Sequence, residues 1–211
     1  MAGHADPATV SDPRLEALLR EFGGPGGGAG PLERAYVAQA LEDWFADETP
    51  EIDLVDLGAL LAGIWAATAH REPDAPPRIH IGPLDGANGR ATGYDVVHIL
   101  QDDGAFLVDS VMGELADAGV SVRAMFHPVV AAGRTAQGAR VAAADRRESI
   151  IVVIVDPLPR ERRDALADGL RATLADVRQA VADHGPMNAA MAGAIGHLRA
   201  GAAGVDTALV E

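Results

Sequence analysis

Two residue types are missing from the sequence of 211 residues, lysine and cysteine, so all 17 basic residues are arginine. Without lysine, the chain has no ammonium group for a Schiff base, for the phosphates of a P-loop or for polarising the substrate of a dehydrogenase. Without cysteine, it has no disulfide, no thiolate nucleophile and no cysteine-ligated zinc or iron–sulfur site. These absences exclude several common catalytic chemistries and agree with a reducing compartment such as the cytoplasm.

Aromatic residues and positive charge are also scarce. Only eight residues are aromatic whereas 42 are alanine, so we expect a core built largely from small residues packed between helices. The 31 acidic residues outweigh the 17 arginines and give a net charge of −14, which opposes binding to phosphate backbones and anionic lipids. No run of about eighteen apolar residues occurs, and residues 1–10 lack the features of a signal peptide. We therefore expect a soluble, cytoplasmic protein that binds neither nucleic acid nor membranes.

Helical patterns dominate residues 1–77. Asp12 followed by Pro13 predicts the start of a short helix, which ends before the glycine-rich segment 23–30. We interpret that segment as a flexible linker. Two further amphipathic segments, one from Pro31 onward and one over residues 53–70, predict a helical hairpin. Residues 1–77 are therefore expected to form a helical N-terminal segment.

A different pattern covers residues 78–186, where β-branched and alternating runs predict strands and a period of 3.6 residues predicts helices. The expected strands are 79–81, 94–100, 120–130, 139–143 and 150–155, and the expected helices are 106–118 and 159–184. The strand 139–143 is predicted to form a hairpin with the strand 120–130, and the strand 79–81 is available to extend an edge.

This order of elements favours an α+β fold. With right-handed crossovers it gives a ferredoxin-like βαββαβ antiparallel sheet with two covering helices, preceded by the N-terminal helical hairpin. Residues 187–211 are rich in alanine and glycine, and they predict a short helix at 188–199 followed by a frayed tail.

Several segments in this region resemble one known family. They are residues 102–111 (DDGAFLVDSV), 126–130 (FHPVV), 148–152 (ESIIV) and the helix at 174–183. In this order and spacing they resemble the N-terminal ACT-like region of the large bacterial NAD-specific glutamate dehydrogenases, over roughly residues 37–187. The family usually has Met-Pro where this chain has Gly104-Ala105, and Asn where it has Gln101.

The resemblance implies that this chain is a regulatory or assembly module and not itself catalytic. The whole enzyme would convert L-glutamate and NAD to 2-oxoglutarate, ammonium and NADH, with its catalytic and NAD-binding domains lying downstream. The implied partners are those downstream domains, an amino-acid effector and further copies of the chain. A free-standing amino-acid sensor and a purely structural scaffold are the alternatives.

In ACT domains generally, amino-acid effectors bind where the first strand ends and the first helix begins, which corresponds here to Asp102, Asp103, Gly104, Ala105 and Phe106, with Asp109 one turn later. Free N–H groups at the helix N-terminus suit an α-carboxylate, and a nearby carboxylate suits an α-ammonium. The simpler interpretation is that Asp103 caps the helix, that Asp102 favours its dipole, and that Asp109 forms an ion pair with an arginine such as Arg123.

Catalytic and metal-binding patterns are not evident. His98 lies within a strand and His127 precedes a proline, and neither has a second histidine or a carboxylate at metal-ligand spacing. None of the four serines, Ser149 included, lies in a nucleophile turn or has a histidine partner that the sequence identifies. We therefore predict no catalytic residue, no metal site and no cofactor in this chain.

Overall fold

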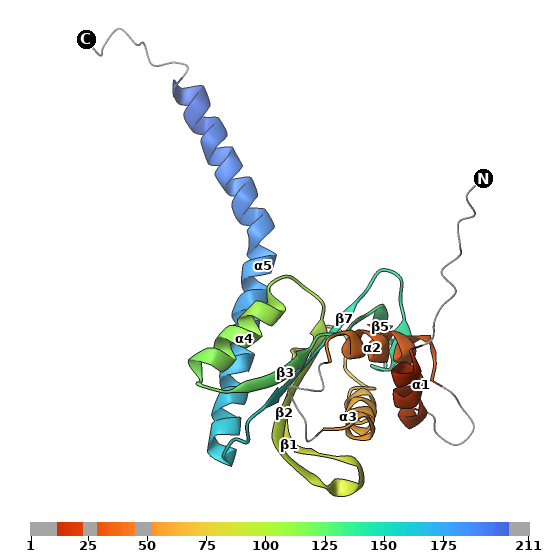
Figure 1. The fold of residues 1–211 in the computed structure, drawn as a ribbon. Coiled ribbons are helices and arrows are strands. Elements are labelled where there is room, and N and C mark those ends of the chain that lie inside the picture. The colour runs from red at the N-terminus through yellow and green to blue at the C-terminus, as the bar shows by residue number, and fades with distance from the viewer. Residues whose placement is uncertain (1–11, 23–28, 45–51, 203–211) are drawn as a thin grey trace, which may run out of the picture.

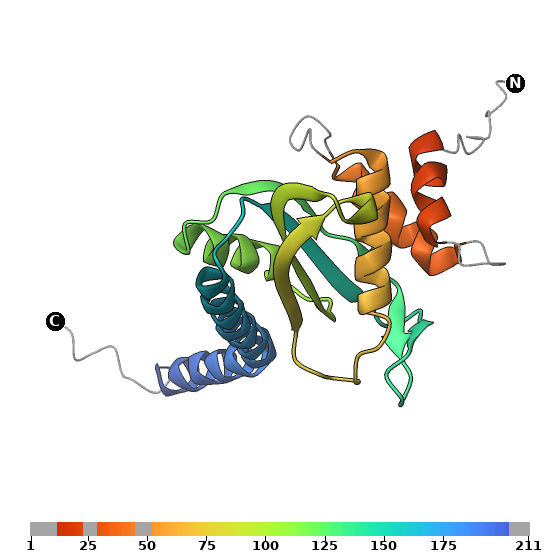
Figure 2. The same cartoon turned by 90° about the horizontal axis from the view of Figure 1, so that it is seen from below.

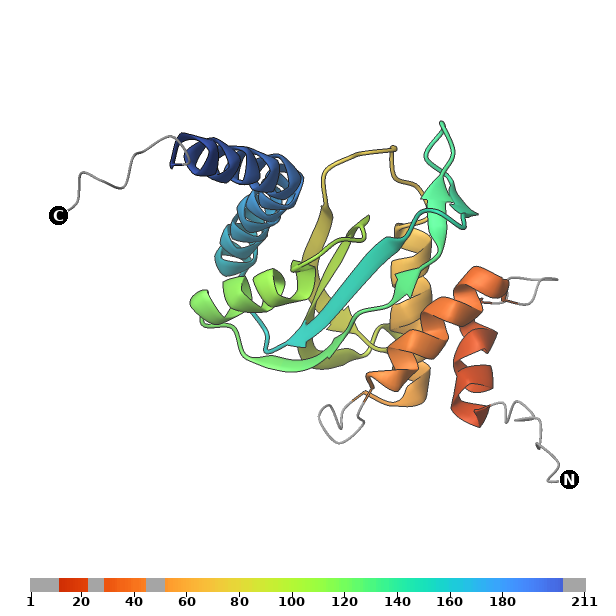
Figure 3. The same ribbon diagram turned by 90° about the horizontal axis from the view of Figure 1, so that it is seen from above.

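A central antiparallel sheet with helices on both faces organises the computed structural model, which describes residues 12–22, 29–44 and 52–202 (Figure 1). Helices α1, α2 and α3 cover one face of the sheet, whereas α4 and α5 cover the other (Figures 2 and 3). The three layers agree with the predicted α+β, ferredoxin-like fold class.

The N-terminal helices are α1 (Pro13–Leu19), continued by a 3₁₀ turn η1 (Arg20–Phe22), then α2 (Pro31–Glu42) and α3 (Leu54–Ala67). As predicted, Asp12 caps α1, and its side chain accepts a hydrogen bond of 2.8 Å from the backbone N–H of Arg14. The rings of Tyr36 on α2 and Trp65 on α3 lie 5.0 Å apart, so these two helices contact each other. Most of the predicted linker, residues 23–28, lies outside the described residues.

The main sheet has the order β1-β2-β7-β3, and the short strand β4 also pairs with β7. Its strands are β1 (Arg78–Asp85), β2 (Ala91–Asp102), β3 (Val122–Phe126), β4 (Val129–Val130) and β7 (Glu148–Val155), with a 3₁₀ turn η3 (Ala87–Gly89) between β1 and β2. Every residue of β7 is buried, because the strand has neighbours on both edges and helices on both faces.

Two expectations about the strands are wrong: the pairing of residues 139–143 and the continuity of the strand 120–130. Residues 139–143 do not pair with the strand 120–130; instead β6 (Arg140–Ala142) pairs with β5 (Ala132–Arg134) in a separate two-stranded sheet. The segment 120–130 is itself divided at Pro128, which has no N–H to donate to a ladder. In the described residues no strand follows α5. The expectation that the strand around residues 79–81 extends an edge of the sheet is confirmed, because β1 is the edge strand beside β2.

Two helices complete the second layer, α4 (Leu107–Asp117) and α5 (Arg160–Ala202). The predicted end of α4 is confirmed, because Gly119 has a φ of +62° that favours glycine. The expected separate helix at 188–199 is instead the last part of α5, which continues through Pro186. Proline kinks a helix, and the axis changes direction in the mid-blue part of α5 in Figures 2 and 3. The alanine-rich residues that follow are strong helix formers, so the helix resumes.

Alternate side chains of the central strands enter two separate hydrophobic cores. On β7, for example, Ile150 and Val152 pack toward the N-terminal helices, whereas Ile151 and Val153 pack toward α4 and α5. This alternation places Gln101 and Ser149 on the face that carries α4 and α5, near the N-terminus of α4.

Candidate functional site

A pocket of about 230 Å³ lies between the β2–α4 loop and helix α5. Four of the six predicted site residues line it, and these are Asp102, Asp103, Gly104 and Ala105. Phe106 and Asp109 are not among the lining residues. Helix α5 supplies the opposite wall, which the sequence analysis did not include, through Leu174, Val177, Arg178 and Val181.

The N-terminus of α4 opens beside this pocket without a side-chain cap. The N-cap residue is Phe106, which has a φ of +65° and makes no side-chain capping hydrogen bond. The expectation that Asp103 caps the helix is therefore wrong, because Gly104 and Ala105 place it too early in the chain. Since the first N–H groups of a helix have no partner within the helix, they are available to an acceptor that enters the pocket.

The side chain of Gln101 provides a second unpaired hydrogen-bond donor at the pocket. The residue lines the pocket and is only 6% exposed, and its side-chain Nε2 is buried without a hydrogen-bond partner. A buried polar group without a partner costs free energy, and most such groups in folded proteins are satisfied. The amide therefore has an unused capacity to donate to a ligand's oxygen.

A histidine lies next to this glutamine on the same face of the sheet. Gln101 and Ser149 are directly opposite each other on β2 and β7, and Nε2 of His127 lies 2.6 Å from Oγ of Ser149. The sequence does not identify this partner of Ser149, because pairing of β4 with β7 brings together residues that are 22 positions apart. Burial lowers the pKa of His127, and the nearby carboxylates of Asp103 and Asp43 oppose that shift.

The two adjacent aspartates of the loop differ in their surroundings. The side chain of Asp102 forms an ion pair with the buried guanidinium of Arg71, which also lies 3.4 Å from Glu148. The side chain of Asp103 is exposed, and its backbone N–H donates to the carbonyl of Arg147 at 3.0 Å. Asp103 is therefore the carboxylate better placed to receive a cationic group.

Three arginines whose side chains are at most 5% exposed surround Glu148, which is 1% exposed. Arg134 contacts both carboxylate oxygens at 2.8 Å, and Arg140 contacts one of them at 3.2 Å. Arg134 and Arg140 also donate to the carbonyl of Thr68 just after α3, each at 3.0 Å. This network joins the end of α3 to the sheet and fixes the base of the β2–α4 loop through Arg71.

The other residues that the sequence analysis discussed form contacts that do not indicate a catalytic site. Arg123, the arginine named as an example of a partner for Asp109, pairs with Asp156 at 2.7 and 2.9 Å. The spacing along the sequence does not reveal a second histidine close to His98, but strand pairing places His80 directly opposite it on β1. No cluster of three or more His, Asp or Glu side chains suited to a metal ion occurs in the part of the chain that is described. Among the described helices, none has the length and apolar character needed to span a membrane.

The antiparallel ferredoxin-like sheet, its two covering helices and a pocket where a strand end meets a helix N-terminus are features of an ACT-type domain. Residues 36–170 match the family model described as "Glutamate dehydrogenase, ACT1 domain", and the chain belongs to this family. It is also similar to the NAD-specific glutamate dehydrogenase of Halomonas elongata, with 33% identity over 175 residues. This alignment covers 78% of the chain but 10% of the relative, so the chain spans about a tenth of that enzyme's length.

Proposed function

We propose that this chain is the N-terminal, non-catalytic regulatory module of a cytoplasmic NAD-specific glutamate dehydrogenase, and that it binds an amino acid in the pocket beside α4. The observation that carries the proposal is the meeting of an uncapped helix N-terminus with the buried, unpaired amide of Gln101 at one pocket. Both features provide N–H donors that suit a carboxylate.

The arrangement of charge around the pocket favours a zwitterionic ligand. The α-carboxylate would accept hydrogen bonds from the first N–H groups of α4 and from Gln101, with Arg178 adding positive charge from α5. The α-ammonium would lie against Asp103, because Asp102 is already paired with Arg71. Leu174, Val177 and Val181 would contact the ligand's side chain. A volume of about 230 Å³ suits a single amino acid and is too small for a dinucleotide.

In this proposal, the longer polypeptide carries out the glutamate dehydrogenase reaction. The relative's name and the tenth of its length that the chain covers support a whole enzyme that oxidises L-glutamate with NAD, with NAD bound by domains outside this chain. The 211-residue protein alone is expected to produce no NADH from glutamate and NAD. Glutamate-dependent NADH formation by the purified chain would contradict this assignment.

A thermal-shift screen tests the binding proposal. The purified chain is heated with each of the twenty amino acids and with 2-oxoglutarate, NAD and NADH. A ligand that binds the native state at 100 times its Kd stabilises it by about 2.7 kcal/mol, which raises the Tm of a chain of this size by roughly 5–10 °C. We expect one amino acid, or a few closely related ones, to give such a shift.

Matched variants connect the shift to the pocket. Asp103→Asn and Gln101→Leu should remove the shift, because the first removes a negative charge and the second removes an amide from the lining of the pocket. Asp109→Asn is the control, since that residue carries the same charge but does not line the pocket. A shift that survives both pocket variants would place the site elsewhere. The absence of any shift would favour the structural scaffold over both the regulatory module and a free-standing sensor.

A further inference from the structure

A groove of about 290 Å³ lies on the opposite face of the sheet from the amino-acid pocket, between α3 and the hairpin of β1 and β2. Small and apolar side chains of α3 form one wall, and the hairpin forms the other. Two of the hairpin residues that line the groove are histidines, His80 and His98. Asp85 also lines it. None of these residues takes part in the function proposed above.

The two imidazoles are held as a pair by strand pairing. His80 and His98 are direct partners in the antiparallel ladder, and their ring centroids lie 4.9 Å apart with the ring planes at 36°. Zinc–nitrogen bonds of about 2.0–2.1 Å place the centres of two imidazoles that share one ion roughly 5 Å apart. The observed separation of the ring centres therefore matches the separation that two imidazoles bound to a single ion require.

Each histidine also has coordinating capacity that the fold does not use. His98 is 7% exposed, and its Nδ1 is buried without a hydrogen-bond partner. Beside His80, the next residue on the same face is Gly82, and a Cβ added there would lie 3.1 Å from the Nε2 of His80. The Nε2 of His80 therefore faces the space beside Gly82, which an added methyl group would reduce. Arg78, the nearest arginine along β1, donates to the carbonyl of His70 at 3.2 Å.

We propose that His80 and His98 bind one divalent transition-metal ion of the class that prefers imidazole, such as Zn²⁺ or Cu²⁺, with water completing its coordination. Neutral imidazole is a common ligand for both ions, and Cu²⁺ binds a given nitrogen site more tightly than Zn²⁺. With two protein ligands, the site binds metal more weakly than a closed structural zinc site with four. It is independent of the amino-acid pocket, so either proposal can fail without the other.

Copper titration of the untagged 211-residue chain tests this site. All proteins carry His4→Ala, so that the histidine near the amino terminus contributes no copper site of its own. We expect one Cu²⁺ per chain, with nitrogen hyperfine structure from two imidazoles in the electron paramagnetic resonance spectrum. Zn²⁺ should compete for the same site in a titration against a chromophoric chelator.

Two variants and one control make the result decisive. His80→Ala removes an exposed ligand and should weaken Cu²⁺ binding at least tenfold, with a Tm close to that of the parent. Gly82→Ala keeps both ligands but adds a methyl group beside Nε2 of His80, and it should weaken binding severalfold. The control replaces His184 and His197 on α5 by alanine and should bind as the parent does. Unchanged binding in His80→Ala, or loss of binding in the control, would overturn the proposal.

Discussion

At the scale of single residues, Glu148 is the carboxylate on which the buried arginine network depends. The side chains of Arg71, Arg134 and Arg140 are 4%, 3% and 5% exposed, so none of the three charges is well hydrated. Removing one partner of a buried ion pair leaves charge uncompensated and typically costs about 3–5 kcal/mol. We therefore expect Glu148→Gln to lower the free energy of unfolding by that amount, as measured by urea denaturation.

An exposed ion pair provides the control for that measurement. The side chains of Arg123 and Asp156 are 48% and 37% exposed, although their geometry is good. Exposed pairs of this kind contribute about 0–1 kcal/mol, so Asp156→Asn should cost little. If Glu148→Gln were as mild as Asp156→Asn, the network would contribute far less stability than its burial indicates.

His127 makes stability depend on pH in a definite direction. Its pKa is lowered in the folded state by burial, in opposition to Asp103 and Asp43. In the unfolded chain a histidine binds a proton near pH 6.5. Above that pH both states are neutral, and below it the unfolded state binds the proton first, so stability falls as the pH falls. Urea denaturation at pH 7.5 and 5.5 should therefore show a larger loss for the parent than for His127→Gln. An equal loss in both proteins would contradict this assignment.

At the scale of elements, substitution by alanine is expected to change the stability of the protein in opposite directions at two glycines with similar surroundings. A Cβ added at Gly113 or at Gly119 meets no atom within 4 Å, so neither substitution causes a clash. Gly113 lies inside α4, where alanine should stabilise the protein by about 0.5–1 kcal/mol. Gly119 has a φ of +62°, where alanine should destabilise it by about 1–2 kcal/mol. Thermal unfolding of the two variants measures the contrast, and effects of the same sign would contradict it.

Features that depend on a local stretch of sequence could be predicted, whereas features that depend on contacts between distant residues could not. Asp12 and Gly119 act through the local backbone at the ends of helices, and β7 is a contiguous apolar run. The sequence therefore predicted these three features correctly. The β2–α4 loop could be identified as a candidate site because its motif is contiguous. Contacts across the sheet could not be identified in this way. The pairs His80 with His98 and His127 with Ser149, and the wall that α5 adds to the pocket, depend on strand register and helix packing.

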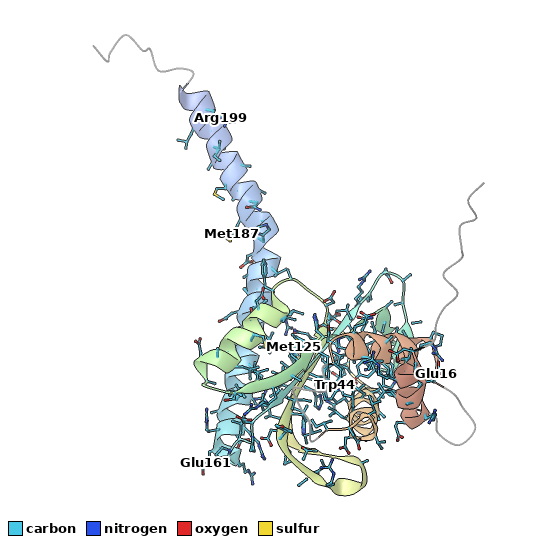
Figure 4. All side chains as sticks on the ribbon, in the orientation of Figure 1. Glu16, Trp44, Met125, Glu161, Met187 and Arg199 are labelled. Atoms are coloured by element: carbon cyan, nitrogen blue, oxygen red, sulfur yellow. The ribbon has the colours of Figure 1, made fainter. Side chains whose placement is uncertain are left out.

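At the scale of the whole molecule, the distal half of α5 extends beyond the sheet and its covering helices, and Figure 4 shows Met187 and Arg199 on this part. Four apolar side chains there are largely exposed, Met187 at 63%, Met191 at 58%, Ile195 at 46% and Leu198 at 73%. Their spacing of four, four and three residues places them along one side of the helix. A continuous exposed apolar stripe of this kind is typical of a surface that another part of an assembly covers.

This stripe predicts how the isolated chain associates. Met191→Glu combined with Ile195→Glu should leave the free energy of unfolding within about 0.5 kcal/mol of the parent, because both side chains are already exposed. The same double variant should shift the protein toward the monomer in size-exclusion chromatography with light scattering. Ala182→Glu combined with Ala189→Glu adds equal charge on the opposite side of α5 and should not change the oligomeric state. If the stripe variant and this control behave alike, charge repulsion and not the stripe controls association. If the parent is already monomeric, a second copy does not cover the stripe, and the remaining candidate is another domain of the longer enzyme.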